Sequence, residues 1–337
     1  MACLRGRVSG QYAAASATIE PMSPIMPTNI FNLDDHDAAG CYARWRDAKL
    51  ANMPTSADEL IVEVCDPRSL TPAEHGAIAA RLARANMAIY ASHISVEGIE
   101  EKSIPMALGR QFGLSRLDGN WLADEDKVTP ITVDNDGSRH HYIPYTTQPM
   151  NWHTDGYYND RSQPICAMLL HCVRPASRGG ENTLLDHEIA YIRLRDHDPG
   201  LVRALMAADV MTIPAREDED GVARGAVAGP VFSCHPVSGR LHMRYTARTR
   251  SIAWTDAPPT RAAVAWLQAL LASDEPAKIR ARLEPGMGLL CANVLHNRAR
   301  FEDDPAAPRL LYRARYFDEI SRVPLHETEP RQVCLAP

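Results

Sequence analysis

The chain has 337 residues, of which 45% are hydrophobic and 23% are charged, and its net charge is −6 at pH 7. This is a globular composition, long enough for a sizeable core, and its mild acidity without a basic stripe argues against a nucleic-acid partner. The longest apolar run, at 262–272, is shorter than the roughly 18 residues of a membrane span, so no membrane association is expected.

The N-terminal residues 1–27 are predicted to be a disordered tail that ends in a proline-bearing stretch. The first 19 residues carry no acid, which faintly resembles a transit peptide, but they contain no apolar signal-peptide core. The eight cysteines are scattered, and none forms a Cys-x-x-Cys pair. Their spacing therefore argues against zinc-ribbon and thioredoxin-like proteins and favours a reduced, cytoplasmic setting.

The first half of the chain is predicted to mix strands and helices. Strands are expected at 60–66, 88–94 and 128–134, and helices at 71–86 and 104–113. The first helix has strong start signals, because Thr71 can cap it, Pro72 suits its first turn and Glu74 completes a capping box. Gly113 is expected to end the second helix.

The second half is predicted to be richer in strands. They are expected at 165–173, 181–186, 231–236, 241–246, 288–297 and 309–317, with helices near 187–208 and 258–273. Many strands joined by short turns favour a sandwich or barrel, and the helices would cover its outside. No convincing linker interrupts the pattern. One domain over 28–337 is therefore predicted, of mixed α/β class with a mainly β core and a helical insertion around 187–275.

The stretch QPMNWHTDGYYN, residues 148–159, places His153 two residues before Asp155. If the stretch ends a strand, these two side chains share one face and could bind one ion. They would form two-thirds of the two-histidine, one-carboxylate set that holds non-haem Fe(II). Thr-Asp-Gly is also a good turn sequence, and the motif alone leaves both interpretations open.

A third ligand would have to come from a distant strand, and His296 ends an apolar one. Other histidines are weaker candidates: His326 lies in a polar tail, His140 in a loop and His171 in an apolar run typical of a core. After His296 and a polar loop comes a strand with strict alternation. One of its faces would carry Arg309, Leu311, Arg313 and Arg315, and the other Leu310, Tyr312, Ala314 and Tyr316. By itself this pattern also fits an edge strand with a wet face.

Together these motifs resemble one family. His153-x-Asp155, then GGENTLL, then His296 with arginines thirteen and seventeen residues later, is similar to the taurine dioxygenase-like group of Fe(II)/2-oxoglutarate oxygenases. The resemblance covers about 88–318. It implies a double-stranded β-helix (jelly-roll) core with flanking helices, in which the insertion forms outer helices and part of an active-site lid.

The resemblance also implies roles for individual residues. The iron ligands are matched by His153, Asp155 and His296. Thr183 matches a threonine whose hydroxyl helps bind a 2-oxoglutarate carboxylate, although GGENTLL is one residue longer than the shortest family versions before it. Arg309 matches the arginine that pairs with the far carboxylate. Arg313 matches an arginine that contacts the substrate anion in some members.

The function implied is oxidation of a small organic anion or zwitterion. Fe(II), 2-oxoglutarate and O2 would be used, succinate and CO2 released, and a substrate C–H bond hydroxylated. Tyr157 is a candidate for substrate binding, and the aromatic residues Trp152, Tyr157 and Tyr158 either line the site mouth or simply pack beside a strand end. Arg313 could instead support the co-substrate or pair with an internal acid such as Asp186.

Three alternatives remain open at this point. The same fold could carry out desaturation, or it could be a non-catalytic metal-binding jelly roll. A zinc hydrolase is a weaker alternative, because no glutamate base accompanies the ligands. A homo-oligomer is a possible assembly.

Overall fold

The computed structural model describes residues 29–94, 98–119, 124–134, 137, 139–140, 142–218 and 221–322. The predicted N-terminal tail at 1–27 and the polar stretch with His326 lie outside these residues. No helix within the described ranges combines the length and the apolar character that crossing a membrane requires.

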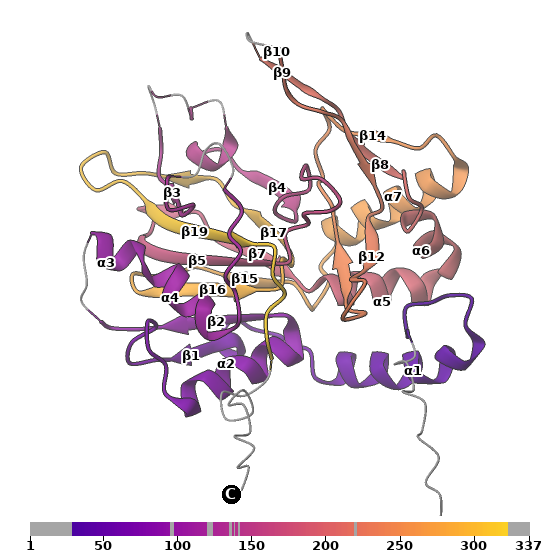
Figure 1. Ribbon diagram of the computed structural model, residues 1–337, viewed down its shortest axis with the longest axis horizontal. Coiled ribbons are helices and arrows are strands. Elements are labelled where there is room, and N and C mark those ends of the chain that lie inside the picture. The colour runs from indigo at the N-terminus through magenta and orange to yellow at the C-terminus, as the bar shows by residue number, and fades with distance from the viewer. Residues whose placement is uncertain are drawn as a thin grey trace, which may run out of the picture.

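Two β-sheets face each other at the centre of the protein (Figure 1). The larger sheet consists, in spatial order, of β1 (Ile61–Glu63), β2 (Met87–Ala91), β16 (Met287–Cys291), β5 (Ala167–Arg174), β19 (Leu310–Tyr316) and β3 (Thr129–Ile131). The smaller sheet consists of β15 (Ile279–Ala281), β7 (Asn182–Leu185), β17 (Leu295–Arg298) and β4 (Met150–His153). Only β1 and β2 run parallel within these two sheets.

Apolar side chains fill the space between the sheets. Leu184 and Ile279 of the smaller sheet share one buried cluster with Leu170, Leu289 and Leu311 of the larger sheet. Because side chains alternate along a strand, this cluster identifies which residues of each strand face inward. The two-layered arrangement agrees with the predicted mixed α/β class with a mainly β core.

Helices cover the outer face of the larger sheet (Figure 1). This layer contains α2 (Pro72–Ala85), the short α3 (Ile99–Lys102) and α4 (Ile104–Gln111). Two 3-10 turns lie elsewhere in the chain, η1 (Asp58–Leu60) and η2 (Ile143–Tyr145). The predicted capping box of α2 is confirmed, because Thr71 accepts from the amide of Glu74 while Glu74 accepts from the amide of Thr71. Leu82 of α2 and Leu108 of α4 lie in one buried cluster with Tyr316 of β19.

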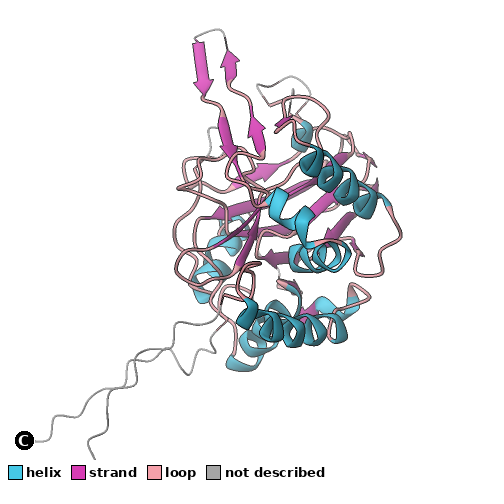
Figure 2. Cartoon of the chain, turned by 90° about the vertical axis from the view of Figure 1, so that its right-hand side faces the viewer, coloured by secondary structure: helices cyan, strands magenta, loops and turns pink. Residues whose placement is uncertain are grey.

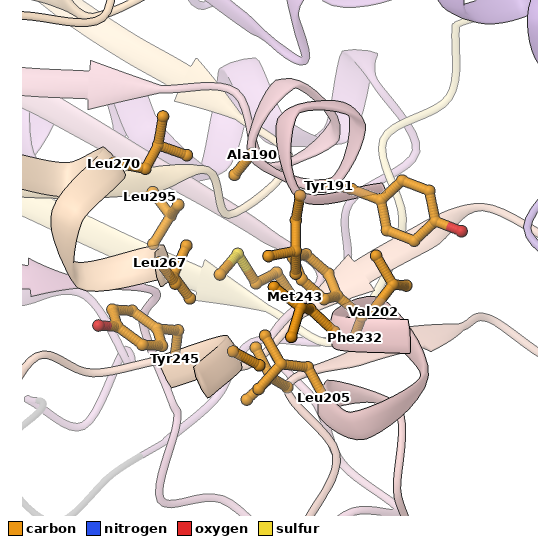
Figure 3. Packing of buried hydrophobic residues seen from close by; sticks show 14 of the residues in the cluster. Ala190, Tyr191, Val202, Leu205, Phe232, Met243, Tyr245, Leu267, Leu270 and Leu295 are labelled. Atoms are coloured by element: carbon orange, nitrogen blue, oxygen red, sulfur yellow. The ribbon is translucent and has the colours of Figure 1, made fainter. Parts of the chain in front are cut away.

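The insertion builds a second hydrophobic cluster against the outer face of the smaller sheet (Figure 3). Its helices are α5 (His187–His197), α6 (Pro199–Leu205) and α7 (Pro258–Ala272), and α1 (His36–Ala51) packs beside α5. Tyr191, Leu205 and Leu267 meet Leu295 from β17 in this cluster. The predicted helices at 187–208 and 258–273 are therefore confirmed, whereas α1 was not predicted.

Short strands complete the insertion, and most of them were not predicted. They are β8 (Met211–Ile213), β9 (Arg216–Asp218), β10 (Gly221–Arg224), β11 (Val227–Gly229), β12 (Phe232–Cys234), β13 (Leu241–Met243) and β14 (Ala253–Trp254). The pair β12–β13 is the predicted hairpin, and the β9–β10 hairpin projects from the body of the protein (Figures 1 and 2). Near the core, β6 (Arg178–Gly179) pairs with β18 (Phe301–Glu302).

The predicted strand at 288–297 is in fact two strands in different sheets. It breaks between Cys291, which ends β16, and Leu295, which begins β17. Asn293 lies in the break with a φ of 48°, in the left-handed region that asparagine tolerates better than most residues. The break carries the chain from the larger sheet to the smaller one, and it brings His296 next to β4.

Candidate metal centre and active site

His153, Asp155 and His296 converge in the interior, where their exposed fractions are only 7%, 5% and 6%. His153 ends β4 and pairs directly with His296 on β17, so both rings lie on the inward face. One ligand atom of each residue lies within 4.8 Å of the other two. The distance to Oδ1 of Asp155 is 3.6 Å from Nε2 of His153 and 4.0 Å from Nε2 of His296.

Both imidazoles are oriented by a backbone carbonyl two residues earlier. Nδ1 of His153 lies 2.8 Å from the carbonyl of Asn151, and Nδ1 of His296 lies 3.0 Å from that of Val294. A carbonyl can only accept, so Nδ1 carries the proton and Nε2 keeps its lone pair toward Asp155. Burial is the main cause that lowers the pKa of His296 to about 4, and this ring is therefore neutral at pH 7.

The carboxyl of Asp155 is held in its ionised form. Burial opposes its ionisation, but the guanidinium of Arg313 and the contact with His153 outweigh burial and hold the pKa of Asp155 well below its usual value. Two neutral imidazoles and one carboxylate on one side of a site are the donor set of the Fe(II) facial triad, which leaves positions open for other ligands. The residues present therefore fit Fe(II).

The turn and the metal-site interpretations of residues 153–156 are compatible. Asp155 follows β4 in a turn, where Gly156 has a φ of 66° and a Cβ would approach Ile165 to 2.3 Å. Asn293 fixes this turn from the strand break. Its Oδ1 accepts from the amide of Asp155 at 2.7 Å, and its Nδ2 donates to the carbonyls of Asp155 and Ile165 at 2.9 and 2.7 Å.

Replacing Asn293 by alanine should destabilise the fold and weaken Fe(II) binding together. It would leave buried polar groups of the backbone without partners, at a cost of roughly 1–3 kcal/mol for each lost partner. Urea unfolding of the metal-free protein and anaerobic Fe(II) titration measure the two effects. Asn293→Gly is the matched control, because glycine accepts the positive φ. If Asn293→Gly behaved like wild type, backbone conformation rather than the side-chain hydrogen bonds would explain the asparagine.

The arginines of β19 face inward and are buried. The predicted alternation is confirmed, because Leu311 lies in the cluster between the sheets whereas Ala314 and Tyr316 lie under the outer helices. The exposed fractions of Arg309, Arg313 and Arg315 are 6%, 9% and 3%. Since β19 also lies between β5 and β3, the alternative of an edge strand with a wet arginine face is wrong.

The acid that pairs with Arg313 is Asp155. Its Nη1 lies 3.2 Å from Oδ2 of Asp155. Asp186, which had been considered as a partner, caps α5 instead and pairs with the buried Lys49 at 2.6 Å. Arg313 therefore directly contacts a candidate metal ligand, an arrangement that strand alternation alone did not predict.

Arg309 has a buried guanidinium without an acidic partner. Among the described residues no side-chain hydrogen bond or ion pair is formed by this group, which lies 5.1 Å from the ring centroid of Phe301. Burial is the main cause that lowers the pKa of Arg309 to about 10. The carboxylate of Asp303 opposes this shift but forms no ion pair with the guanidinium. A buried cation without an ion-pair partner is unfavourable by several kcal/mol, so this position suits an anionic ligand.

The register corrects the prediction for Thr183. Thr183 pairs with Arg280, which is exposed, and it has the parity of Leu185, which packs against the insertion. Its side chain thus points away from the space between the sheets. The inward position belongs to Asn182, which lies opposite Arg298 on the face of His296. The additional residue in GGENTLL was the signal for this shift.

The three aromatic residues of the motif have different surroundings. Tyr157 meets the ring of His153 edge-on at 6.4 Å, and the hydroxyl of Tyr158 accepts from Arg315 at 2.8 Å. Trp152 instead packs against the insertion on the outer face. Of the three, Tyr157 is adjacent to a candidate ligand, and ordinary packing accounts for Trp152.

The competing histidines do not join the site. His171 is buried in the larger sheet, with Nδ1 2.9 Å from the hydroxyl of Tyr90. This agrees with its interpretation as a core histidine. His140 is exposed, as expected for a loop.

Residues 105–315 match the family described as taurine catabolism dioxygenase TauD, TfdA family. The chain belongs to this family. It is a 2-oxoglutarate-dependent dioxygenase, and the enzymes of its family use Fe(II), 2-oxoglutarate and O2. The predicted family, enzyme class and cofactors are therefore confirmed, and the non-catalytic and zinc-hydrolase alternatives are set aside.

Individual relatives support the same conclusion. A uridine-5'-phosphate dioxygenase from Streptomyces sp is 34% identical over 219 residues, which cover 62% of this chain and 76% of the relative. An asparagine oxygenase solved with Fe(II), 3-hydroxyasparagine and succinate has 14% identity and a TM-score of 0.53, over 73% of this chain and 78% of its own. AAD-2, solved with Mn(II) and N-oxalylglycine, has 18% identity and a TM-score of 0.57, over 78% and 96%. These two structures establish the fold, so the predicted jelly-roll core is confirmed.

Proposed function

We propose that this dioxygenase oxidises a C–H bond of a small organic anion, with His153, Asp155 and His296 as its Fe(II) ligands. The observation that carries the proposal is the buried set of two imidazoles and one carboxylate, in a protein whose strand β19 is preceded by a buried arginine without an ion-pair partner among the described residues. We further propose that residues 28–337 form one catalytic domain. The cysteine spacing still favours a cytoplasmic setting.

The co-substrate site is proposed to lie at the Arg309 end of β19. The guanidinium of Arg309 would hold the far carboxylate of 2-oxoglutarate through two parallel hydrogen bonds, and it keeps its charge at every physiological pH. Arg298 is less suited to this role, because its guanidinium already donates to the carbonyls of Ile143, Pro144, Thr146 and Gln148. Asn182, opposite Arg298, is placed to add a neutral hydrogen bond.

When bound, Fe(II) and 2-oxoglutarate would supply the oxidising chemistry, with succinate and CO2 as the released products. The protein's own contribution is positioning and electrostatics. The backbone carbonyls of Asn151 and Val294 set the histidine tautomers, Asn293 fixes the turn that carries Asp155, and Arg313 favours the ionised carboxyl. The two apolar sheets exclude water around these groups.

We propose that the substrate is an organic phosphate of nucleotide type, held partly by Arg313 and bordered by Tyr157. The support is the relative that acts on uridine-5'-phosphate together with the cationic β19 face. Hydroxylation is the proposed outcome. Desaturation is the second candidate, since the same ligand set serves both reactions.

The proposal is tested by succinate release in the presence of Fe(II), 2-oxoglutarate, O2 and ascorbate. Uridine-5'-phosphate should stimulate succinate formation above the substrate-free rate, and mass spectrometry of the nucleotide distinguishes a gain of oxygen from a loss of two hydrogens. Stimulation by an unrelated amine but by no organic anion would contradict the proposed substrate class.

Asn182 and Thr183 form a matched pair for the co-substrate site. Asn182→Ala should raise the KM for 2-oxoglutarate by about 2- to 10-fold, the equivalent of one neutral hydrogen bond of roughly 0.5–1.5 kcal/mol. Thr183→Ala should leave this KM unchanged, because its side chain lies on the outer face. Steady-state kinetics at saturating O2 measures both. The opposite ranking would show that the threonine acts as it does in shorter family motifs.

A further inference from the structure

Two arginines of the insertion approach the tyrosine pair that follows Asp155. The guanidinium of Arg248 lies 5.9 Å from the ring centroid of Tyr157, and that of Arg224 lies 5.9 Å from the ring centroid of Tyr158. The two tyrosine rings are 5.2 Å apart and nearly perpendicular. Building on the function proposed above, we infer that Arg224 and Arg248 form a subsite for the phosphate monoester of the substrate.

Arg248 is connected to the candidate metal centre through its backbone. Thr246, two residues earlier, pairs with His153, and the amide of Ala247 donates to the carbonyl of Trp152 at 2.8 Å. The chain that carries Arg248 therefore runs beside β4. The ring of Tyr157 is a neighbour of both groups, 5.9 Å from the guanidinium of Arg248 and 6.4 Å from the ring of His153. A ligand on this arginine would therefore share Tyr157 as a neighbour with the candidate iron ligands.

Arg224, at the end of β10, is oriented by uncharged groups. It donates to the carbonyls of Pro214, Gly225 and Tyr158 at 2.8, 3.2 and 3.5 Å. These acceptors fix the guanidinium without neutralising it. Burial is the main cause that lowers the pKa of Arg224; Tyr157 and Tyr158 oppose this shift, and the nearby guanidiniums of Arg216 and Arg248 add to it.

Neither Arg224 nor Arg248 has a carboxylate within ion-pair distance among the residues that the structure describes. Arg313 and Arg315 of β19 differ in this respect, because Arg313 pairs with Asp155 and Arg315 pairs with Asp118. Arg244 also differs, since it is buried and donates to the carbonyls of several chain segments, as a structural residue does. The two insertion arginines are thus available to an external anion.

A phosphate monoester fits this arrangement better than a carboxylate. It carries close to two negative charges and three acceptor oxygens, so it can satisfy two guanidiniums at once. The adjacent tyrosine rings offer apolar surface to a sugar or a base. Arg313 would then remain paired with Asp155 and contact the substrate nearer to the reacting carbon.

The inference is tested by calorimetric binding to the Fe(II)- and 2-oxoglutarate-loaded enzyme without oxygen. The probes are uridine-5'-phosphate, ribose-5-phosphate and uridine. Uridine-5'-phosphate should bind at least 10-fold more tightly than uridine. Arg224→Gln and Arg248→Gln should each weaken binding of the phosphate probes by about 10- to 100-fold, the equivalent of a charge-assisted hydrogen bond, and leave uridine binding within a factor of two.

Arg250→Gln is the matched control, because Arg250 is exposed on the same segment as Arg248 but, among the described residues, makes no contact with the two tyrosine rings. Equal binding of uridine and uridine-5'-phosphate by the wild-type enzyme would overturn the inference, and so would unchanged phosphate discrimination in both glutamine variants. Phosphate-dependent binding of ribose-5-phosphate alone would support the subsite and indicate a sugar phosphate as its ligand. Substrate-free succinate formation is measured in parallel, so a failure of the proposed chemistry is seen separately from a failure of the subsite.

Discussion

Alanine in place of His153, Asp155 or His296 should abolish 2-oxoglutarate consumption. Each change removes one of three ligands from a buried site. The loss in Fe(II) affinity should therefore exceed the roughly 10–100-fold cost of removing a group that merely supports a ligand. Succinate formation measures activity, and anaerobic titration with Fe(II) and 2-oxoglutarate measures assembly through the weak visible charge-transfer band of the chelated keto acid.

His140→Ala is the control for the loss of a histidine, since this side chain is exposed and outside the site. It should keep both the activity and the absorption band. A folded variant of His153, Asp155 or His296 that still formed succinate at the wild-type rate would remove that residue from the ligand set.

Arg309→Lys should raise the KM for 2-oxoglutarate by about 10- to 100-fold. Lysine keeps the positive charge but loses the planar fork, and a charge-assisted hydrogen bond contributes roughly 1.5–3 kcal/mol. Arg300→Lys is the matched control, because Arg300 is exposed beyond the end of β17. If the KM for 2-oxoglutarate were unchanged in Arg309→Lys, Arg313 would become the candidate for the far carboxylate.

Arg309→Met tests the same role through protein stability, which is measured independently of enzyme activity. The guanidinium is buried without an ion-pair partner among the described residues, so an apolar side chain of similar length should raise the free energy of unfolding of the protein without ligands. In the same variant, 2-oxoglutarate should no longer raise the unfolding temperature of the metal-loaded protein. Suppose instead that Arg309→Met were less stable than wild type and that 2-oxoglutarate still raised its unfolding temperature. Arg309 would then have a structural role.

Local signals in the sequence determined the elements whose stability is itself local. Thr71, Pro72 and Glu74 specified the start of α2, because a capping box is satisfied within one turn. The alternation over residues 309–316 predicted which side chains of β19 share a face, because the period of a strand is two. The spacing of His153, Asp155 and His296 with the later arginines was sufficient to indicate the family.

Helix α1 shows where local signals are insufficient. Its buried face is only weakly apolar: Tyr42 and Trp45 pack in the insertion cluster, but the face ends in Lys49, whose ammonium is buried against Asp186 and Glu188 of a distant segment. An ion pair between residues so far apart in the chain leaves no periodic pattern in either segment. The helix could therefore not be predicted before the fold brought these residues together.

Only the tertiary structure decided which face of β19 is the inner one, and which acid Arg313 meets. Alternation predicts that Arg309 and Arg313 lie on the same side, but burial of that side depends on the smaller sheet that packs over it. The register of β7 likewise selected Asn182 over Thr183, because a one-residue shift exchanges the two faces of a strand. Asn293 acquired its role only when the chain crossed between sheets and placed its amide against the backbone of Asp155. The family and a set of candidate ligands could be predicted from the sequence, whereas the geometry that brings these residues together depends on contacts between segments more than a hundred residues apart.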